Sequence, residues 1–248
     1  MSDKEYVYGL HAVQAMLERA PKRVRQVMVQ RGRLDARMQA LLDQAASESL
    51  DVERVMPDEL DRLAAGGVHQ GVVALVTASQ LWSEEMLIHL LDRDQGVPLL
   101  LMLDGVTDPH NLGACLRSAD AAGAQAVIIP KDRSASLSPT VRKVASGAAE
   151  TVPLVAVTNL ARTLKQLQQR GLWVVGTAGE AEQLLYQVDL TVPTVIVMGA
   201  EGSGMRRLTR EHCDYLAKLP MAGAVSSLNV SVTAGICLFE AVRQRTVL

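Results

Sequence analysis

The stretch VPLLLMLDGVTDPHNLGACLR, residues 97–117, begins with an unbroken apolar run, continues as a polar loop and ends in helical spacing. Four further short apolar runs follow it, and stretches with helical spacing separate them. Strands that are apolar on both faces and alternate with helices are typical of a parallel sheet covered by helices on both sides. This part of the chain therefore predicts an α/β fold, with strands expected at 99–103, 126–129, 152–157, 173–176 and 194–198.

The residues before this stretch have the pattern of a smaller α/β unit. Helices are expected there at 9–17, 38–46 and 57–63, and strands at 24–30, 52–55 and 72–76. The segment after residue 77 is polar at first and then amphipathic, as in a linker that runs into a helix. We therefore predict a small N-terminal α/β domain over 1–77, a linker over 78–96 and the parallel-sheet domain over 97–248.

The composition is that of a soluble globular protein, with 248 residues, 48% of them hydrophobic, and no apolar run long enough to span a membrane. The first residues, MSDKE, are polar, so export is not expected. The three cysteines lie far apart and not in a CxxC spacing, so we expect reduced thiols. The histidines form no HExxH pattern, and no metal is expected.

In parallel sheets the ligand lies beyond the carboxyl ends of the strands, so chemistry is expected in the loops that follow the apolar runs. The first of these loops holds Asn111, and Arg117 follows it by less than two helical turns. Arg117 is therefore expected near the same loop. Two plainer interpretations remain open: Asn111 as the N-cap of the following helix, and Arg117 as an exposed helix arginine.

Three glycines surround one carboxylate in GAEGSGM, residues 199–205, directly after the last apolar run. Glycines permit a close backbone approach to a ligand, and Glu201 between them is expected to have a specific partner. The order GxxGxG differs from the dinucleotide fingerprint GxGxxG and does not follow the first strand, which argues against a nucleotide-dependent oxidoreductase. A plain turn remains an alternative for the glycines.

A third polar segment lies between a short expected strand at 215–219 and a strongly apolar helical stretch that starts at residue 230. It contains Ser226, Ser227, Asn229 and Ser231, which are polar and uncharged. Ser226 or Ser227 would suffice to cap the helix, so capping does not explain the whole cluster. Hydroxyls and amides supply both donors and acceptors without charge, which predicts a site for a neutral polar ligand.

Taken together, Asn111-x-Gly113-x-x-x-Arg117, the GAEGSG segment 199–204 and the segment from Pro220-Met221 to the SSLNVS residues 226–231 resemble three ordered motifs. They are the motifs of the SpoU family of RNA ribose 2′-O-methyltransferases, which belongs to the SPOUT superfamily. The resemblance covers roughly 97–245. The N-terminal unit, with VHQG at 68–71, resembles the RNA-binding domain that many members carry.

The resemblance implies a C-terminal SPOUT domain with a deep trefoil knot, a homodimer, and S-adenosyl-L-methionine bound in the knotted loops. It implies Arg117 as the base that deprotonates the ribose. A guanidinium normally stays protonated, so a phosphate or oxyanion contact for Arg117, with water or Glu201 as the base, remains the alternative. By resemblance the reaction centre is Asn111, Arg117, Glu201, Ser227 and Asn229, and the adenosyl group is held around Gly199, Leu219 and Leu228.

Local basic density is the sequence feature that predicts RNA docking. Residues 1–37 hold eight basic side chains against four acidic ones, although a solvated helix face explains this equally well. We assign docking to this segment together with Lys131, Arg133, Arg142 and Lys143.

The substrate is implied by resemblance alone. The chain is most similar to family members that methylate a guanosine in the peptidyl-transferase region of 23S ribosomal RNA, which implies that RNA as partner and a cytoplasmic location. A transfer-RNA substrate, and a non-catalytic RNA-binding role in ribosome assembly, remain the alternatives.

Overall fold

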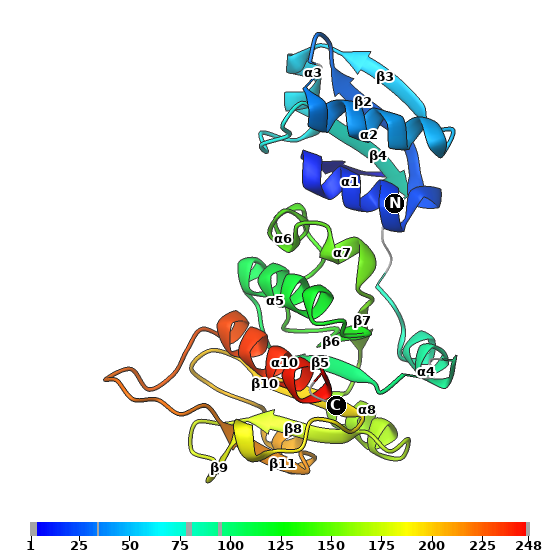
Figure 1. Ribbon diagram of the computed structural model, residues 1–248. Coiled ribbons are helices and arrows are strands. Elements are labelled where there is room, and N and C mark those ends of the chain that lie inside the picture. Colours follow the sequence, from blue (N-terminus) through cyan, green and yellow to red (C-terminus); the bar gives the residue numbers. More distant parts are fainter. Residues whose placement is uncertain (1–3, 34, 78–80, 94–95, 247–248) are drawn as a thin grey trace. The chain divides into compact units, whose positions relative to one another are not determined.

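The computed structural model describes residues 4–33, 35–77, 81–93 and 96–246. These residues form two compact units, drawn in Figure 1 in colours that follow the sequence. Unit 1 takes its described residues from 1–80 and 138–151, and unit 2 from 81–137 and 152–248. The predicted domain limits stay a prediction, and residues 78–80 and 94–95 of the predicted linker lie outside the described residues.

Over its described residues, unit 1 contains a four-stranded sheet in the order β1-β4-β2-β3. β4 (Val72–Thr77) pairs antiparallel with β1 (Lys4–Tyr8) and with β2 (Val24–Gln30), and β2 pairs parallel with β3 (Asp51–Val55). The sequence pattern predicted β2, β3 and β4 and missed β1. That strand is a short sheet edge with charged residues at its start and one buried position, Val7, so its apolar signal is weak.

The helices of the first 77 residues lie close to where the sequence pattern placed them. They are α1 (Leu10–Arg19), α2 (Ala36–Ser47) and α3 (Pro57–Leu63), with a short 3-10 turn, η1 (Pro21–Arg23), before β2. A core cluster joins α1 and α2 to β2 and β4, and a smaller one lies under α3. Each face of this sheet is thus covered by amphipathic helices.

Two later helices, α6 (Pro139–Ala145) and α7 (Ala148–Thr151), also belong to unit 1. Arg142 on α6 pairs with Glu150 on α7 and, at 2.6 Å, with Glu5 on β1. The Arg142 side chain is only 7% exposed. A guanidinium that is buried and engaged by two carboxylates is not available to phosphates, so the prediction of Arg142 as an RNA-docking residue is wrong.

Unit 2 builds, over its described residues, a seven-stranded sheet in the order β7-β6-β5-β10-β8-β11-β9, with every neighbouring pair parallel. The predicted parallel sheet is therefore confirmed, while the trefoil knot stays a prediction. A two-residue strand, β9, was missed because it is too short to carry a pattern. The strands are β5 (Leu99–Asp104), β6 (Ala126–Pro130), β7 (Leu154–Val157), β8 (Trp173–Thr177), β9 (Gln183–Leu184), β10 (Thr194–Gly199) and β11 (Tyr215–Lys218).

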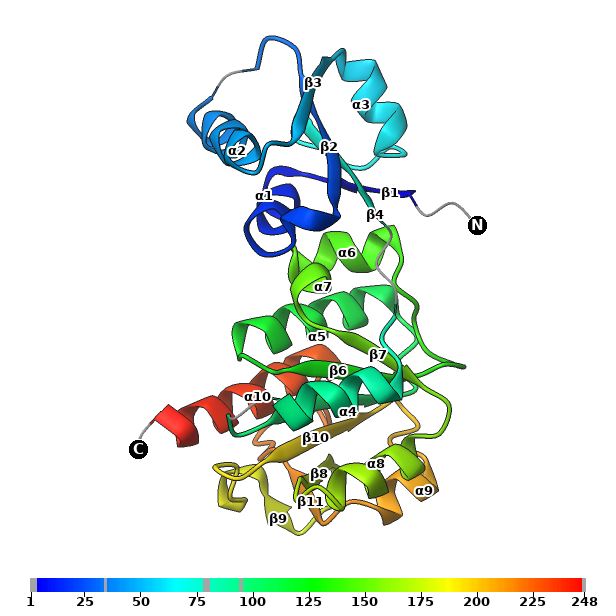
Figure 2. The ribbon, with the colours of Figure 1, turned by 90° about the vertical axis from the view of Figure 1, so that its right-hand side faces the viewer.

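Helices lie on both faces of this sheet. α4 (Glu84–Arg93) and α8 (Leu160–Gln168) share one core cluster with alternate residues of β5, and Figure 2 shows both helices on the near side of the strands. α5 (Pro109–Ala121) and α10 (Val230–Thr246) pack against each other, and they also contact β6 and β10 respectively. The remaining short helices are η2 (Leu185–Gln187) and α9 (Arg207–Glu211).

The last turn of α10 is fixed by Arg245. Its Nε donates to Leu190 O at 2.9 Å, its Nη1 to Val97 O at 2.8 Å, and its Nη2 to Pro98 O at 3.0 Å and Val192 O at 2.8 Å. Burial lowers the pKa of Arg245 from its usual value, because desolvation disfavours the cation. The four carbonyls offset that cost and tie the helix to the amino end of β5.

All three cysteines are free, as predicted, and burial raises the pKa of Cys115 and of Cys237 to about 12. Within the described ranges, no helix is long and apolar enough to cross a membrane. The same part of the chain holds no group of three His, Cys, Asp or Glu residues placed to bind a metal ion.

Candidate active site

A cavity of about 720 Å³ opens at the carboxyl edge of the sheet in unit 2. Its walls come from the ends of β8, β10 and β11, from the loop 200–204 and from the segment 226–230 that precedes α10. Parallel sheets bind ligands at this edge, so the cavity lies where the sequence pattern predicted chemistry. The predicted site residues that line it are Gly199, Leu219, Leu228, Glu201, Ser227 and Asn229.

The register of the sheet brings the first two predicted loops together. β5 and β10 pair in parallel, and Gly199 at the end of β10 is the partner of Asp104 at the end of β5. The chain after Gly199 turns back on itself, since Ala200 N donates to Gly204 O at 3.1 Å and Gly204 N to Ala200 O at 2.9 Å. A Cβ at Gly199 would lie 2.2 Å from Gly204 C and from Met205 N, so only glycine permits this turn.

Three polar side chains meet at the tip of that turn. Glu201 Oε1 accepts from Asn111 Nδ2 at 3.1 Å, from Asn229 Nδ2 at 2.8 Å and from Val230 N at 3.4 Å. Asn229 Nδ2 also donates to Asn111 Oδ1 at 2.9 Å. We call Asn111, Glu201 and Asn229 the polar triad. The structure thus brings together one residue from each of the three predicted motifs.

Asn111 reaches the polar triad from inside a helix. The N-cap of α5 is Asp108, whose carboxylate accepts from His110 N at 2.9 Å, and Pro109 occupies the first turn. Asn111 is 7% exposed and directs its amide to Glu201. The alternative of Asn111 as an N-cap is therefore wrong, because the capping position lies three residues earlier.

The start of α10 is organised by Asn229. Its Oδ1 accepts from Ser231 N at 2.8 Å and from Ser231 Oγ at 2.6 Å, while its amide reaches the polar triad. Ser226 and Ser227 are exposed and line the cavity. The alternative of a serine cap is wrong, because the helix begins at Val230 and Asn229 performs the capping.

Arg117 is the predicted site residue that the structure does not bring to the cavity. It lies on α5 with Asn111, but its side chain is exposed and does not line the cavity. Across the described part of the chain, the Arg117 side chain makes no hydrogen bond or ion pair. Arg117 is therefore an unpaired cation on the helix that carries Asn111.

The carboxylate of Asp104 was not predicted as part of the site. It is 1% exposed and accepts from Arg206 N at 2.8 Å and from Arg206 Nε at 2.5 Å. The pair fixes the chain after the 200–204 turn to the end of β5, beside Gly105. A charged residue at the end of an otherwise apolar run was the available signal, because such a residue needs a partner when it is buried.

Comparisons with known proteins agree on one family. Residues 98–239 match the SpoU rRNA Methylase family, and residues 6–82 match an RNA 2′-O ribose methyltransferase substrate-binding family. The chain is 69% identical over 246 residues to the 23S rRNA (guanosine-2′-O-)-methyltransferase RlmB of Pseudomonas aeruginosa, covering 99% of each chain. It is 58% identical over 243 residues to RlmB of Escherichia coli, covering 98% of this chain and 99% of that one.

Solved structures give the same result. The SpoU methyltransferase AviRb from Streptomyces viridochromogenes, in complex with the cofactor AdoMet, is 27% identical, with a TM-score of 0.80. That comparison covers 99% of this chain and 92% of the AviRb chain. The cavity at the carboxyl edge and the polar triad agree with these matches. The chain belongs to the SpoU rRNA methylase family.

Proposed function

We propose that this protein transfers a methyl group from S-adenosyl-L-methionine to the ribose 2′-hydroxyl of a guanosine in 23S ribosomal RNA, in the peptidyl-transferase region. The observation that carries the proposal is the polar triad beside a cofactor-sized cavity, in a chain 69% identical to an enzyme named for this reaction. We also propose a cytoplasmic location, since ribosomal RNA is made and assembled there.

The cavity fits S-adenosyl-L-methionine. Its volume of about 720 Å³ falls within the range of small-molecule sites, and its lining combines backbone, hydroxyl and amide groups with apolar side chains. Gly199, Leu219 and Leu228 would hold the adenosyl part. When bound, the cofactor supplies an electrophilic methyl group on a sulfonium, for which no metal is needed.

Glu201 is our candidate for the proton acceptor. Its Oε1 accepts hydrogen bonds from the side chains of Asn111 and Asn229 and from the backbone N–H of Val230. Its Oε2 accepts no hydrogen bond from any described residue. Oε2 is thus free to accept the proton of a ribose hydroxyl while the two asparagines hold the carboxylate in place. Ser227, on the exposed wall of the cavity, would bind the target ribose.

We assign Arg117 to a phosphate of the bound RNA. It is an exposed cation without a partner in the described chain, and it lies on the helix that carries Asn111. A guanidinium binds a phosphate through paired donors and keeps its charge, whereas a general base must lose a proton. This assignment keeps the alternative in which Glu201 or water removes the proton.

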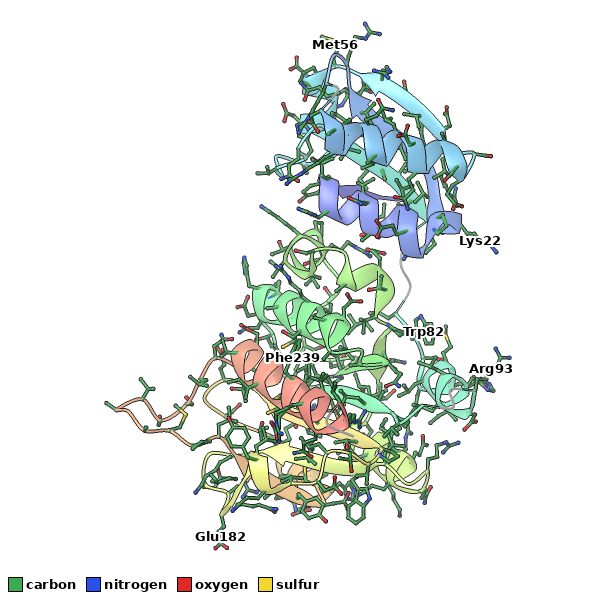
Figure 3. All side chains as sticks on the ribbon, viewed as in Figure 1. Lys22, Met56, Trp82, Arg93, Glu182 and Phe239 are labelled. Carbon is green, nitrogen blue, oxygen red and sulfur yellow. The ribbon has the colours of Figure 1, made fainter. Side chains whose placement is uncertain are left out.

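RNA docking by unit 1 is a further part of the proposal. Lys22, Arg31 and Arg37 are exposed and form no ion pair with any described residue, and Lys143 on α6 is exposed as well. Figure 3 shows the Lys22 side chain extending outward from unit 1. The match of residues 6–82 to a substrate-binding family supports this docking surface, which relies on phosphate contacts.

The homodimer is proposed from the exposed face of α10. Val232 and Phe239 lie seven residues apart, hence on one side of the helix, and are 50% and 49% exposed. Phe239, the only phenylalanine in the chain, is labelled on α10 in Figure 3. Large apolar side chains exposed together on one helix face favour burial against a second copy.

The proposed function predicts methyl transfer to one ribose. Incubation with radiolabelled S-adenosyl-L-methionine should label unmodified 23S RNA, and mapping should place the label on a guanosine 2′-oxygen. Label confined to transfer RNA would keep the chemistry and contradict the substrate. Absence of label in naked RNA and in ribosome assembly intermediates would favour the non-catalytic alternative.

Gly199→Ala is expected to weaken cofactor binding, because the new Cβ would overlap the backbone of Gly204 and Met205 and displace the turn. Titration calorimetry with S-adenosyl-L-methionine measures the effect, and a loss of more than roughly ten-fold in affinity is expected. Gly179→Ala is the matched control, since Gly179 also lines the cavity but its Cβ would meet open space. Equal affinities for the two variants would contradict the assignment of Gly199.

Arg117→Ala is expected to slow single-turnover methyl transfer by roughly 100-fold, and Arg117→Lys by less, because a cation at this position stabilises negative charge. The pH dependence of the rate should be the same in the lysine variant as in the unsubstituted protein. A pH profile that shifts with the lysine substitution would instead support Arg117 as the base. Retention of most of the rate in Arg117→Ala would exclude both roles.

Phe239→Glu is expected to give monomers in size-exclusion chromatography with light scattering, because the charge cannot be buried in the interface. The control is Leu208→Glu on α9, where the leucine is 52% exposed on a different surface. The Leu208 variant should keep the mass of the unsubstituted protein. A monomeric unsubstituted protein, or a Phe239→Glu protein that stays dimeric, would contradict the proposed interface.

A further inference from the structure

A second, smaller cavity of about 290 Å³ lies at the carboxyl ends of β6 and β7 in unit 2. This volume lies just below the range of typical ligand pockets, about 300–1,000 Å³. The cavity is therefore too small for a cofactor of the size of a dinucleotide. Its lining residues are Leu81, Trp82, Ser83, Ile129, Pro130, Lys131, Ser134, Ala135, Ser136 and Ala156. Lys131 is the one lining residue that the sequence assigned to RNA docking, and no function assigned above uses the others.

The walls of this cavity are fixed by backbone hydrogen bonds. Trp82 extends the sheet beside β7, because its N donates to Leu154 O at 2.9 Å and its O accepts from Ala156 N at 3.0 Å. On the other side, Lys131 N donates to Val157 O at 2.9 Å. The opening is therefore part of the folded sheet edge, because the backbones of Trp82 and Lys131 both hydrogen-bond to β7.

Two lining side chains have unused binding groups. The Nε1–H of Trp82 finds no acceptor among the described residues, although the ring is partly buried against the core. Lys131 is exposed and makes no ion pair or side-chain hydrogen bond within that part of the chain, and no carboxylate lines the cavity. An aromatic ring with a free donor next to an unpaired cation suits an aromatic group attached to an anion.

The loop that supplies Lys131 and Ser134 to this cavity lies across the Gly105 turn from the loop that carries Glu201. A Cβ at Gly105 would lie 3.6 Å from Ala200 Cβ and 4.0 Å from Arg133 O. Gly105, in the turn after β5, therefore lies between two loops and contacts both. One of those loops carries Glu201, and the other runs from Lys131 to Ser136. Ala135 N donates to Val106 O at 2.9 Å and fastens the second loop to this turn.

We propose that this cavity, the flanking pocket, receives one nucleotide of the substrate RNA next to the methylated residue, with its base against Trp82 and its phosphate on Lys131. The inference rests on the proposed function and deepens it. An RNA strand whose target ribose lies at the polar triad passes the Gly105 turn and meets the flanking pocket along the same sheet edge. Single-stranded RNA is read by this combination of aromatic stacking and backbone cations.

Fluorescence of Trp82 tests the contact directly. The chain has two tryptophans, and the other, Trp173, opens β8 at the amino end of the sheet and stacks on Tyr215. In a full-length Trp173→Phe protein, titration with a 23S RNA fragment that spans the methylated guanosine should quench the emission of Trp82. The reciprocal Trp82→Phe protein, which retains Trp173, should show no change. Unquenched Trp82 at saturating RNA would overturn the proposal.

Kinetics test the same pocket independently. Trp82→Leu should raise KM for the RNA roughly ten-fold or more, as expected for loss of one stacked base. Trp82→Phe, which keeps a ring, should stay near the unsubstituted value. Lys131→Ala should raise KM. It should also reduce the slope of the logarithm of RNA affinity against the logarithm of salt concentration by about one unit, as for one lost phosphate contact. The kcat and the affinity for S-adenosyl-L-methionine should remain unchanged, which shows that each variant is folded.

Lys165→Ala is the control for charge, because Lys165 on α8 is exposed and unpaired among the described residues but lies away from the flanking pocket. It should leave KM unchanged. If the unsubstituted protein methylates RNA while Trp82→Leu and Lys131→Ala keep its KM, the flanking pocket is wrong and the function stands. If the unsubstituted protein methylates no RNA, the proposed function fails and the substrate assigned to the pocket fails with it.

Discussion

The parallel pairing of β5 with β10 is the constraint on which the site depends. It aligns Asp104 with Gly199, so the loops that follow both strands leave the sheet at the same point. The buried Asp104 carboxylate then holds Arg206, and the chain between Gly199 and Arg206 has room only for a tight turn. Glu201 stands at the tip of that turn, which Gly199 permits by its lack of a Cβ and Gly202 and Gly204 permit by their positive φ angles.

Around Glu201 the polar triad joins segments that are far apart in the sequence. Asn111 comes from the first turn of α5, and Asn229 from the residue before α10. Asn111 lies within α5 and Asn229 caps α10, and both side chains also bind Glu201. The packing of α5 against α10 therefore also sets the geometry of the carboxylate. The cavity for the cofactor and the flanking pocket lie on either side of this arrangement, along one edge of one sheet.

The sequence predicted the elements of this arrangement better than their contacts. Apolar runs identified the parallel strands, since burial on both faces leaves a continuous signal, and polar loops after them identified the motifs. Local rules failed where a residue has a distant partner: they left a helix cap open as an alternative for Asn111, and they gave Arg142 as an RNA-docking cation. Short elements such as β1 and β9 have too few residues for a pattern to show.

The single-turnover rate of Glu201→Gln with 23S RNA, measured beside its affinity for S-adenosyl-L-methionine, tests most directly whether Glu201 is the base. Glutamine keeps the shape of the side chain and an acceptor oxygen for Asn111 and Asn229, but it cannot take a proton. A general-base role for Glu201 predicts unchanged cofactor affinity and a rate reduced by roughly 100-fold or more, the usual contribution of a general base. A rate within a few-fold of the unsubstituted protein would show that Glu201 only holds the loops, and would contradict the mechanism.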